Sequence, residues 1–205
     1  MITGILLAAG AGSRFGGDKL LFPLDDGTPL GVKSGRNLLC GVDRAIAVVR
    51  PADQVLARLY EEAGLRVTYC PGAAVGMGGS LACGVRAAPD ADGWLIALAD
   101  MPFIRADTIH AVTGLLRAGA ALAAPSYYGR RGHPVGFAQA FFNELTSLGG
   151  DRGASSLLAA HASSLQYLDC DDPGILIDID NRSDLVNNRH APDSGFRAQS
   201  HAGCP

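Results

Sequence analysis

The segment Ile2-Thr-Gly-Ile-Leu-Leu-Ala8 is an apolar run of strand length, and after Ala9 it leads into the loop Gly10-Ala-Gly-Ser-Arg-Phe-Gly-Gly-Asp-Lys19. Small residues after a buried strand let the backbone approach a ligand closely, and consecutive N–H groups can form an anion site. In open α/β sheets the ligand crevice lies outside the carboxyl ends of the strands, where this loop falls. Arg14 and Lys19 add the positive charge that a triphosphate requires. The segment therefore predicts an α/β fold that binds an anion beside its first strand.

Apolar runs of strand length alternate with amphipathic runs of helix length along the chain. Continuous runs such as Trp94–Ala99 are typical of strands buried on both faces, as in a parallel sheet covered by helices. This alternation predicts a three-layer α/β domain with a mostly parallel sheet. The expected strands are Ile2–Ala8, Ala45–Val49, Arg66–Tyr69, Trp94–Ala99, Ala121–Pro125, Pro134–Phe137 and Leu165–Leu168. The expected helices are Pro29–Leu39, Ala52–Ala63, Ser80–Ala87, Arg105–Ala118, Ala138–Leu148 and Ser155–His161.

The composition of the 205-residue chain excludes several classes of protein. With 48% hydrophobic residues it has enough apolar material for a sizeable core, which excludes wholesale disorder. A formal net charge of −3 argues against nucleic acid or an anionic membrane as the main partner. No apolar stretch approaches the ~18 residues of a membrane span, and five scattered cysteines favour a reduced, cytoplasmic protein. We expect one domain over residues 1–188 and a polar tail over residues 189–205.

Two commoner glycine-rich loops do not fit the first loop. In a dinucleotide-binding loop Phe15 would stand where the third glycine belongs, and the second expected strand leads to Arg50 rather than to an acidic residue for a ribose. In a P-loop, Asp18 would intrude before Lys19, and Leu20 would replace the Ser or Thr that binds magnesium. A flexible turn with an incidental arginine and lysine stays open as the alternative.

Three aspartates follow apolar segments. Asp100 comes directly after the run Trp94–Ala99, so its carboxylate faces the same crevice as the first loop and can ligate Mg²⁺. The alternative is a cap for the helix Arg105–Ala118. Asp178 and Asp180 flank one residue, so in an extended segment they point the same way. One would complete the metal site while the other caps the next helix, or both would be caps.

Six motifs resemble, in order, the signature of the MobA-like nucleotidyltransferases, a family with a Rossmann-like α/β fold. They are Leu7–Gly16 with Lys19, Gly76–Leu81, Leu98–Pro102, Gly132–Val135, Gly149–Ala154 and Asp178–Asn181. The first motif is shared by many sugar and cofactor nucleotidyltransferases. The second, fourth and fifth are similar to the branch that contains molybdenum cofactor cytidylyltransferase. Two departures bear on substrate choice: Leu24–Gly31 keeps only part of the family's Gly-x-Pro-Leu-Leu pattern, and Gly79 stands where relatives often carry Ser or Ala.

The resemblance implies a Mg²⁺-dependent enzyme that moves CMP from CTP to molybdopterin and releases pyrophosphate. Arg14 and Lys19 would contact phosphates as catalytic residues, and Asp100 with Asp180 would hold the metal. The nucleotide would lie against Leu7, Ala8, Ala9, Gly10, Gly12 and Ser13, with its base and ribose beside Gly78, Gly79 and Ser80. The acceptor would contact Arg130, Arg131, His133 and Asp151.

Alternatives remain for several of these assignments. Ser80 is also a natural N-cap, so its segment can be a capped turn without a ligand. A histidine before a proline, such as His133, is more often a structural loop residue, and Asp151 can form an ion-paired cap with Arg152. The base can be guanine and the acceptor another phosphorylated small molecule, or the chain can be a non-catalytic binding module. A molybdoenzyme or its maturation chaperone is a further expected partner.

Overall fold

The computed structural model describes residues 1–10, 15, 17–71, 76–150 and 153–187. Its eight strands form one sheet in the order β3-β2-β1-β4-β7-β5-β6, with β8 paired to β5. Strands β1 to β4 are mutually parallel, β5 and β8 are parallel to each other, and β7 joins the two sets by antiparallel pairing with β4 and β5. The strands are β1 Ile2–Leu7, β2 Arg44–Val49, β3 Arg66–Tyr69, β4 Gly93–Leu98, β5 Leu122–Tyr127, β6 Arg130–Arg131, β7 Val135–Ala138 and β8 Leu165–Asp169.

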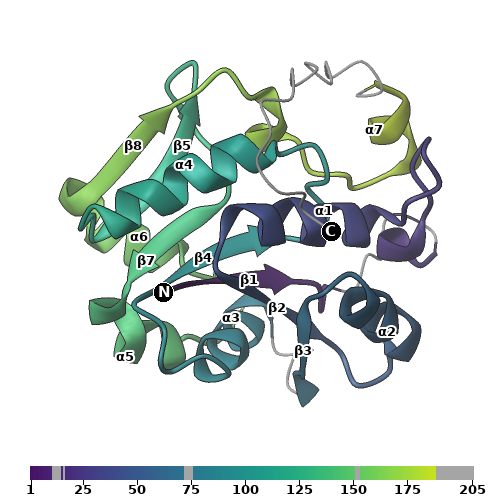
Figure 1. The fold of residues 1–205 in the computed structure, drawn as a ribbon, viewed down its shortest axis with the longest axis horizontal. Coiled ribbons are helices and arrows are strands. Elements are labelled where there is room, and N and C mark those ends of the chain that lie inside the picture. Colours follow the sequence, from purple (N-terminus) through teal and green to yellow (C-terminus); the bar gives the residue numbers. More distant parts are fainter. Residues whose placement is uncertain (11–14, 16, 72–75, 151–152, 188–205) are drawn as a thin grey trace.

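Helices cover both faces of this sheet and make three layers, as the sequence predicts. One buried cluster includes residues of α1, α2 and α4, and a second includes residues of α3, α5 and α6. Figure 1 shows α1 and α4 side by side in front of the strands. The helices are α1 Leu30–Gly41, α2 Gln54–Glu62, α3 Met77–Arg86, α4 Ala106–Arg117, α5 Phe142–Thr146, α6 Ser155–Ala160 and α7 Arg182–Asn187.

The first strand shows how the sequence builds these layers. Ile5 packs into the cluster on the α3 side and Leu6 into the cluster on the α1 side, because successive strand residues point to opposite faces. Both side chains are fully buried, which stabilises the fold by roughly 1.5–3 kcal/mol each. A Cβ at Gly4 would lie 2.8 Å from Leu38 Cγ. Glycine is therefore required where α1 crosses β1 closely.

The third helix begins earlier than its sequence predicts. Helix α3 starts at Met77 and its N-cap is Gly76, whose φ of 111° is a conformation that favours glycine. Ser80 is thus buried in the first turns of the helix and is not its cap, which corrects that expectation. The helix can start early because Gly78 packs on the backbone at Gly149, where a Cβ would approach the carbonyl oxygen to 2.8 Å.

The expected helix over Ala138–Leu148 is also corrected. Ala138 belongs to β7, Gln139–Phe141 form a 3₁₀ turn, and only Phe142–Thr146 are α-helical. Two backbone hydrogen bonds hold the first part in the sheet region: Ala138 N–H donates to Ala121 O and Gln139 N–H donates to Asp92 O. The apolar pattern of this stretch fits either structure, and tertiary pairing decides between them.

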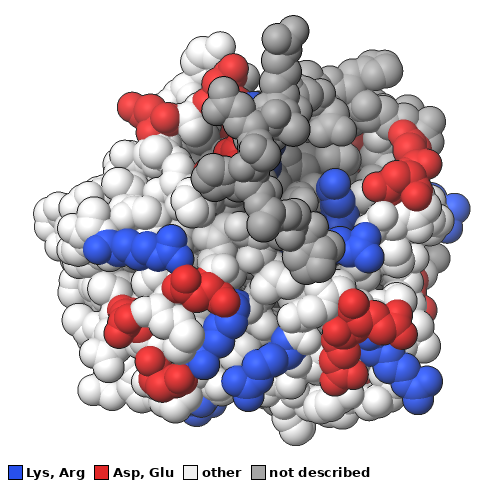
Figure 2. All heavy atoms as spheres, viewed as in Figure 1, with Lys and Arg blue, Asp and Glu red and all other residues white. Residues whose placement is uncertain are grey.

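The remaining features concern the surface and the cysteines. Figure 2 shows acidic and basic side chains interspersed over the face in view. Within the described ranges, no helix has the length and apolar character of a membrane span. Cys70, Cys83 and Cys170 are free thiols. The tail expected over residues 189–205 lies outside the described residues.

Candidate functional site

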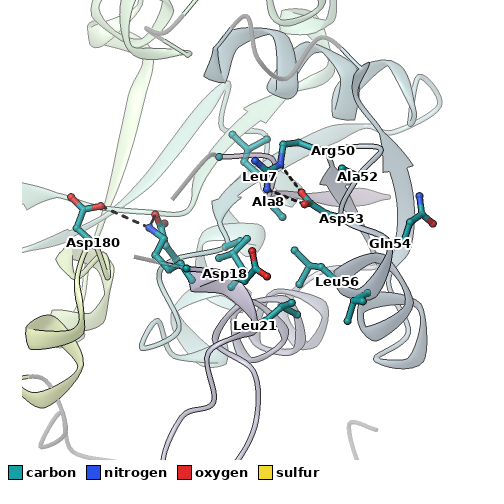
Figure 3. A pocket seen from close by; sticks show the side chains of 17 residues that line it. Leu7, Ala8, Asp18, Leu21, Arg50, Ala52, Asp53, Gln54, Leu56 and Asp180 are labelled. Atoms are coloured by element: carbon teal, nitrogen blue, oxygen red, sulfur yellow. Dashed lines mark hydrogen bonds and ion pairs between the residues drawn. The ribbon is translucent and has the colours of Figure 1, made fainter. Parts of the chain in front are cut away.

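A cleft of about 480 Å³ opens where β1, β2 and β4 end (Figure 3). Its walls come from five parts of the chain. They are Leu7, Ala8 and Gly10 after β1, Gly17–Leu21 before α1, Arg50 and Ala52–Leu56 after β2, and Ala99, Asp100 and Asp180. The cleft therefore lies at the carboxyl edge of the parallel strands, where ligands of open α/β folds bind.

Lys19 brings the two acidic walls of the cleft together. Its Nζ donates to Asp100 Oδ2 at 2.8 Å and lies 3.8 Å from Asp180 Oδ1. The lysine side chain is 10% exposed, so these attractions are screened by water and salt far less than those of a surface pair. Two carboxylates and one ammonium leave the group with a net charge of about −1, which favours a further cation beside them.

Helix α1 fixes the turn that carries Asp100. Ser34 Oγ donates to Ala99 O at 2.9 Å, and Asn37 Nδ2 donates to Pro102 O at 3.0 Å and Ile104 O at 2.9 Å. On the other side, Ile179 N–H donates to Asp100 O at 2.9 Å. These bonds satisfy backbone carbonyls in a turn that leaves the sheet ladder. The carboxylate of Asp100 is thus held on a rigid backbone.

A small apolar cluster holds Asp180 opposite that turn. Ile179 is fully buried in a cluster with Phe15, Leu30 and Leu185. Arg182 Cζ lies 5.9 Å from the centroid of Phe15 and 5.3 Å from that of Phe22, within cation–π range of both rings. Burial of residue 179 in this cluster places the neighbouring carboxylate at the cleft.

Neither Asp178 nor Asp180 is the residue whose side chain caps α7. Asn181 Oδ1 accepts from the N–H groups of Ser183 and Asp184, so Asn181 caps α7. The prediction that one or both of the two aspartates cap this helix is wrong. Asp180 pairs with Lys19, whereas Asp178 acts on His133, whose pKa its charge raises in part.

His133 lies deeper, beside the turn of Asp100. Desolvation lowers the pKa of its imidazole below the ordinary 6.5, and the charge of Arg131 lowers it further. Asp100, a backbone hydrogen bond at Ile96 and Asp178 oppose that shift without cancelling it. The ring is therefore neutral at neutral pH. Its Nδ1 is buried without a hydrogen-bond partner among the described residues.

The other expected contact residues are not among those that line the cleft, or they fall outside the described residues. Gly78 N–H donates to Gly150 O at 2.8 Å, Gly79 O accepts from Cys70 Sγ, and Ser80 is 5% exposed. Arg130 and Arg131 are exposed on β6, a strand that the sequence does not predict because two arginines carry no apolar pattern. Ala9 is buried and does not line the cleft. Gly12, Ser13, Arg14 and Asp151 are not described.

One charged pair in the cleft was not predicted. Arg50 Nε and Nη2 bind Asp53 Oδ2 and Oδ1 at 2.7 and 2.9 Å in a two-pronged ion pair. Gln54 follows on the same wall (Figure 3). Arg50 directly follows the second strand, so the edge rule that located Asp100 applies to it too.

The donor set fits a hard divalent cation that is shared with phosphate. Within the part of the chain that the structure describes, no three His, Cys, Asp or Glu side chains gather in a metal-binding group. Asp100 and Asp180 provide two carboxylates on either side of Lys19. Mg²⁺ is commonly held by one or two carboxylates together with substrate phosphates and water. The cleft thus resembles a metal site that a nucleotide completes.

Comparison with known proteins agrees with this geometry. Residues 4–165 match the MobA-like NTP transferase domain family. The chain belongs to this family. PucB, a purine catabolism protein of Bacillus subtilis, is 32% identical over 87% of this chain and 91% of its own. Nicotine blue oxidoreductase of Paenarthrobacter nicotinovorans is 31% identical over 87% of this chain and 92% of its own.

A solved structure shares the fold of this MobA-like chain. Rv0371c of Mycobacterium tuberculosis H37Rv has a TM-score of 0.73 and 29% identity, covering 91% of this chain and 96% of that one. A manganese complex of Rv0371c matches with a TM-score of 0.71 and 27% identity over the same shares. The Rossmann-like nucleotidyltransferase fold expected from the sequence is therefore confirmed.

Proposed function

We propose that this MobA-like nucleotidyltransferase moves CMP from CTP to molybdopterin with the help of Mg²⁺. The observation that carries the proposal is the Lys19 ammonium between Asp100 and Asp180, at the mouth of a cleft that the first strand opens into. A binding module needs no buried lysine between two carboxylates, because such a group costs free energy to desolvate. A nucleotidyltransferase needs a positive charge there for the phosphates and negative charges for the metal ion.

The reaction needs charge neutralisation more than a base. A phosphate oxygen of the acceptor attacks the α-phosphorus of the triphosphate, the new P–O bond forms, and the bond to the bridging oxygen breaks so that pyrophosphate leaves. An ionised phosphate is already a nucleophile, so positioning and electrostatic stabilisation supply the rate. Lys19 would turn from the carboxylates to the phosphates, where its charge stabilises negative charge that shifts during transfer.

Asp100 and Asp180 would hold the metal ion, whose charge neutralises phosphate oxygens. The manganese complex of Rv0371c supports a divalent ion in this family. Leu7, Ala8 and Gly10 line the cleft with small groups that would admit the nucleotide. Ala9, Gly12, Ser13 and Arg14 belong to the same loop, and Gly78–Ser80 keep their proposed place beside the base and ribose. Arg130, Arg131, His133 and Asp151 are proposed for the acceptor.

One assay separates the proposal from its alternatives. The protein is incubated with each of the four nucleoside triphosphates, Mg²⁺ and molybdopterin, and pyrophosphate release is measured. Release with CTP in preference to the other three supports the proposal. Preference for GTP would replace cytidylyl by guanylyl transfer, and release that needs a different phosphorylated acceptor would replace molybdopterin.

A non-catalytic role has its own signature. Tight binding of nucleotide without pyrophosphate release from any triphosphate would indicate a binding module. One relative is named for an oxidoreductase activity, so membership of the family alone does not fix the reaction of this chain. The assay therefore includes Asp100→Asn. Pyrophosphate release that this substitution leaves unchanged would not be catalysed in the cleft.

A further inference from the structure

An ion pair on the wall of the cleft takes the place of a helix cap. Asp53 stands at the N-cap position of α2, where an aspartate commonly accepts hydrogen bonds from the first N–H groups of the helix. In this helix, which is described in full, its carboxylate makes no such bond. Both of its oxygens instead accept from Arg50, through Nε at 2.7 Å and Nη2 at 2.9 Å. The carboxylate therefore orients the guanidinium rather than the helix.

The guanidinium of Arg50 keeps a second edge for a ligand. The pair with Asp53 uses Nε and one hydrogen of Nη2. Nη1 and the other hydrogen of Nη2 thus form a further edge with two parallel donors. Among the residues that the structure describes, this edge has no hydrogen-bond acceptor. The side chain lines the cleft and is 39% exposed, so a ligand in the cleft can reach it.

This edge lies across the cleft from the proposed metal site. Figure 3 shows Arg50 and Asp53 on one side of the cleft and Asp180 on the opposite side. Ala8 N–H donates to Val48 O, so Arg50 directly follows the strand that flanks the small-residue end of β1. The cleft, at about 480 Å³, has the size of small-molecule sites. A nucleotide whose phosphates lie at the ammonium and carboxylates therefore has its base on the side of the guanidinium.

Two parallel donors select bases that present two adjacent acceptors. Cytosine offers O2 and N3 side by side, and a guanidinium edge can bond both at once. Uracil carries a hydrogen on N3, and adenine places its amino group beside N1, so each opposes one guanidinium hydrogen with another. Guanine offers two adjacent acceptors only at O6 and N7, where arginine pairs of this kind are common. The free edge of Arg50 therefore suits cytosine and disfavours uracil and adenine.

We propose that Arg50, oriented by Asp53, selects the base of the nucleoside triphosphate by donating to O2 and N3 of cytosine. The proposal rests on the nucleotidyl-transfer function and identifies the side chain that selects its nucleotide. It explains why the aspartate at the start of α2 holds an arginine rather than the N–H groups of the helix. Gly78–Ser80 keep their proposed place beside the base and ribose, and the choice among bases is made at Arg50.

Arg50→Gln tests this assignment through the preference for CTP over UTP. The glutamine amide has one donor and one acceptor, so it can pair with the mixed edge of uracil as well as with cytosine. Calorimetric titration with CTP and with UTP, with Mg²⁺ and without an acceptor, gives both Kd values without turnover. We expect the wild type to prefer CTP. The ratio of the UTP Kd to the CTP Kd should fall by roughly five- to 150-fold in the variant, as ~1–3 kcal/mol for one bidentate pair implies.

Three further variants separate base selection from charge and from folding. Arg50→Lys keeps the positive charge without the planar pair of donors, so the Kd ratio should fall here too. Asp53→Asn loosens the orientation of the arginine and should lower the ratio by a smaller factor. Arg58→Gln, which removes an exposed arginine on the same helix, should change neither Kd. The Tm of each variant is measured alongside, because the Arg50 pair is partly exposed and its loss should cost little stability.

The outcomes distinguish this proposal from the transfer reaction itself. An unchanged ratio in Arg50→Gln, or equal affinity of the wild type for CTP and UTP, would overturn base selection by Arg50 even if the protein transfers CMP. A wild-type ratio in Arg50→Lys would also overturn it, because the residue would then act by charge alone. A ratio that depends on Arg50 in a protein that releases no pyrophosphate would preserve the base contact and refute the transfer reaction.

Discussion

At the scale of single residues, the site depends on three charges. Lys19, Asp100 and Asp180 lie within 2.8–3.8 Å of one another through the lysine Nζ, although they are 81 and 161 positions apart in sequence from that lysine. Their mutual attraction keeps the lysine largely buried, and their net negative charge favours an added cation. Substitutions at this group should therefore change metal binding and turnover before they change the fold.

Asp100→Asn removes one proposed metal ligand and keeps the shape of the side chain. We expect kcat to fall by about 10²–10³-fold or more, since one electrostatic contact in the transition state contributes on this order. Thermal unfolding should stay near that of the wild type, because Asp100 is held by its backbone contacts. Pyrophosphate release with an Mg²⁺ titration measures the effect. Asp90→Asn, which breaks the surface pair with Arg44, is the matched control and should leave kcat intact; near wild-type turnover in Asp100→Asn would remove the metal assignment.

Lys19→Gln separates metal binding from catalysis. The ammonium occupies the space between the two carboxylates that the metal is proposed to use. Without nucleotide, the variant should bind Mn²⁺ several-fold more tightly than the wild type, because a competing positive charge is gone. With nucleotide it should turn over more slowly, since the phosphates lose a cationic partner. Electron paramagnetic resonance of free Mn²⁺ measures the first effect, and weaker metal binding in the variant would contradict this account.

At the scale of elements, α7 is the part that completes the cleft. The helix has six residues, too few to be stable alone, so its contacts hold it in place. Arg182 lies over the rings of Phe15 and Phe22, and Leu185 packs beside Ile179. This docking carries Asp180 to Lys19. The element thus links the loop after β1 to the proposed metal site through an aromatic pair.

Arg182→Gln should loosen that link without unfolding the protein. The cation–π contacts of the exposed Arg182 contribute about 0.5–1 kcal/mol, so the free energy of unfolding should fall by no more than that. The metal concentration for half-maximal activity should rise several-fold, because Asp180 is held less firmly. Arg58→Gln, an exposed arginine on α2, serves as the control. A pure loss of stability with an unchanged metal requirement would show that α7 does not position Asp180.

The elements also show what the sequence could and could not predict. The expected ends of β1, β2 and β4 agree with the structure to within one residue, since these are continuous apolar runs of strand length rather than of helix length. The start of α3 was misplaced because it depends on a left-handed Gly76 and on contact with the distant backbone at Gly149. Asp100 was placed by the edge rule for parallel strands. The Arg50–Asp53 pair was missed because no motif marks it.

At the scale of the whole molecule, the fold brings the site together through the order of its strands. β1 lies between β2 and β4, so the carboxyl ends that carry Lys19, Arg50 and Asp100 meet at one edge. The antiparallel β7 was predicted as a strand, but its direction was not, because direction depends on the hairpin turn after β5 and not on apolar pattern. That reversal brings His133 to a place where the charge of Asp100 acts on it.

The buried His133 makes the stability of the whole chain depend on pH. Its folded pKa lies below the ordinary 6.5 because burial disfavours the charged ring. Below about pH 6.5 the unfolded chain binds a proton at this residue that the folded chain does not. The free energy of unfolding therefore rises with pH in this range, by at most about 1.4 kcal/mol per pH unit. Above pH 6.5 both states are neutral at this ring and the contribution is flat.

His133→Gln tests this origin by urea unfolding at pH 5, 6, 7 and 8. The variant should lose less stability than the wild type as the pH falls from 7 to 5, although the substitution itself lowers stability at every pH. His110→Gln, at an exposed site on α4, should lose as much stability as the wild type when the pH falls from 7 to 5. If the free energy of unfolding falls equally for His133→Gln and the wild type between pH 7 and pH 5, the ring is protonated in the folded protein. In that case His133 would be a cation beside Asp100 and Asp178, and it would contact an acceptor phosphate by charge rather than as a neutral group.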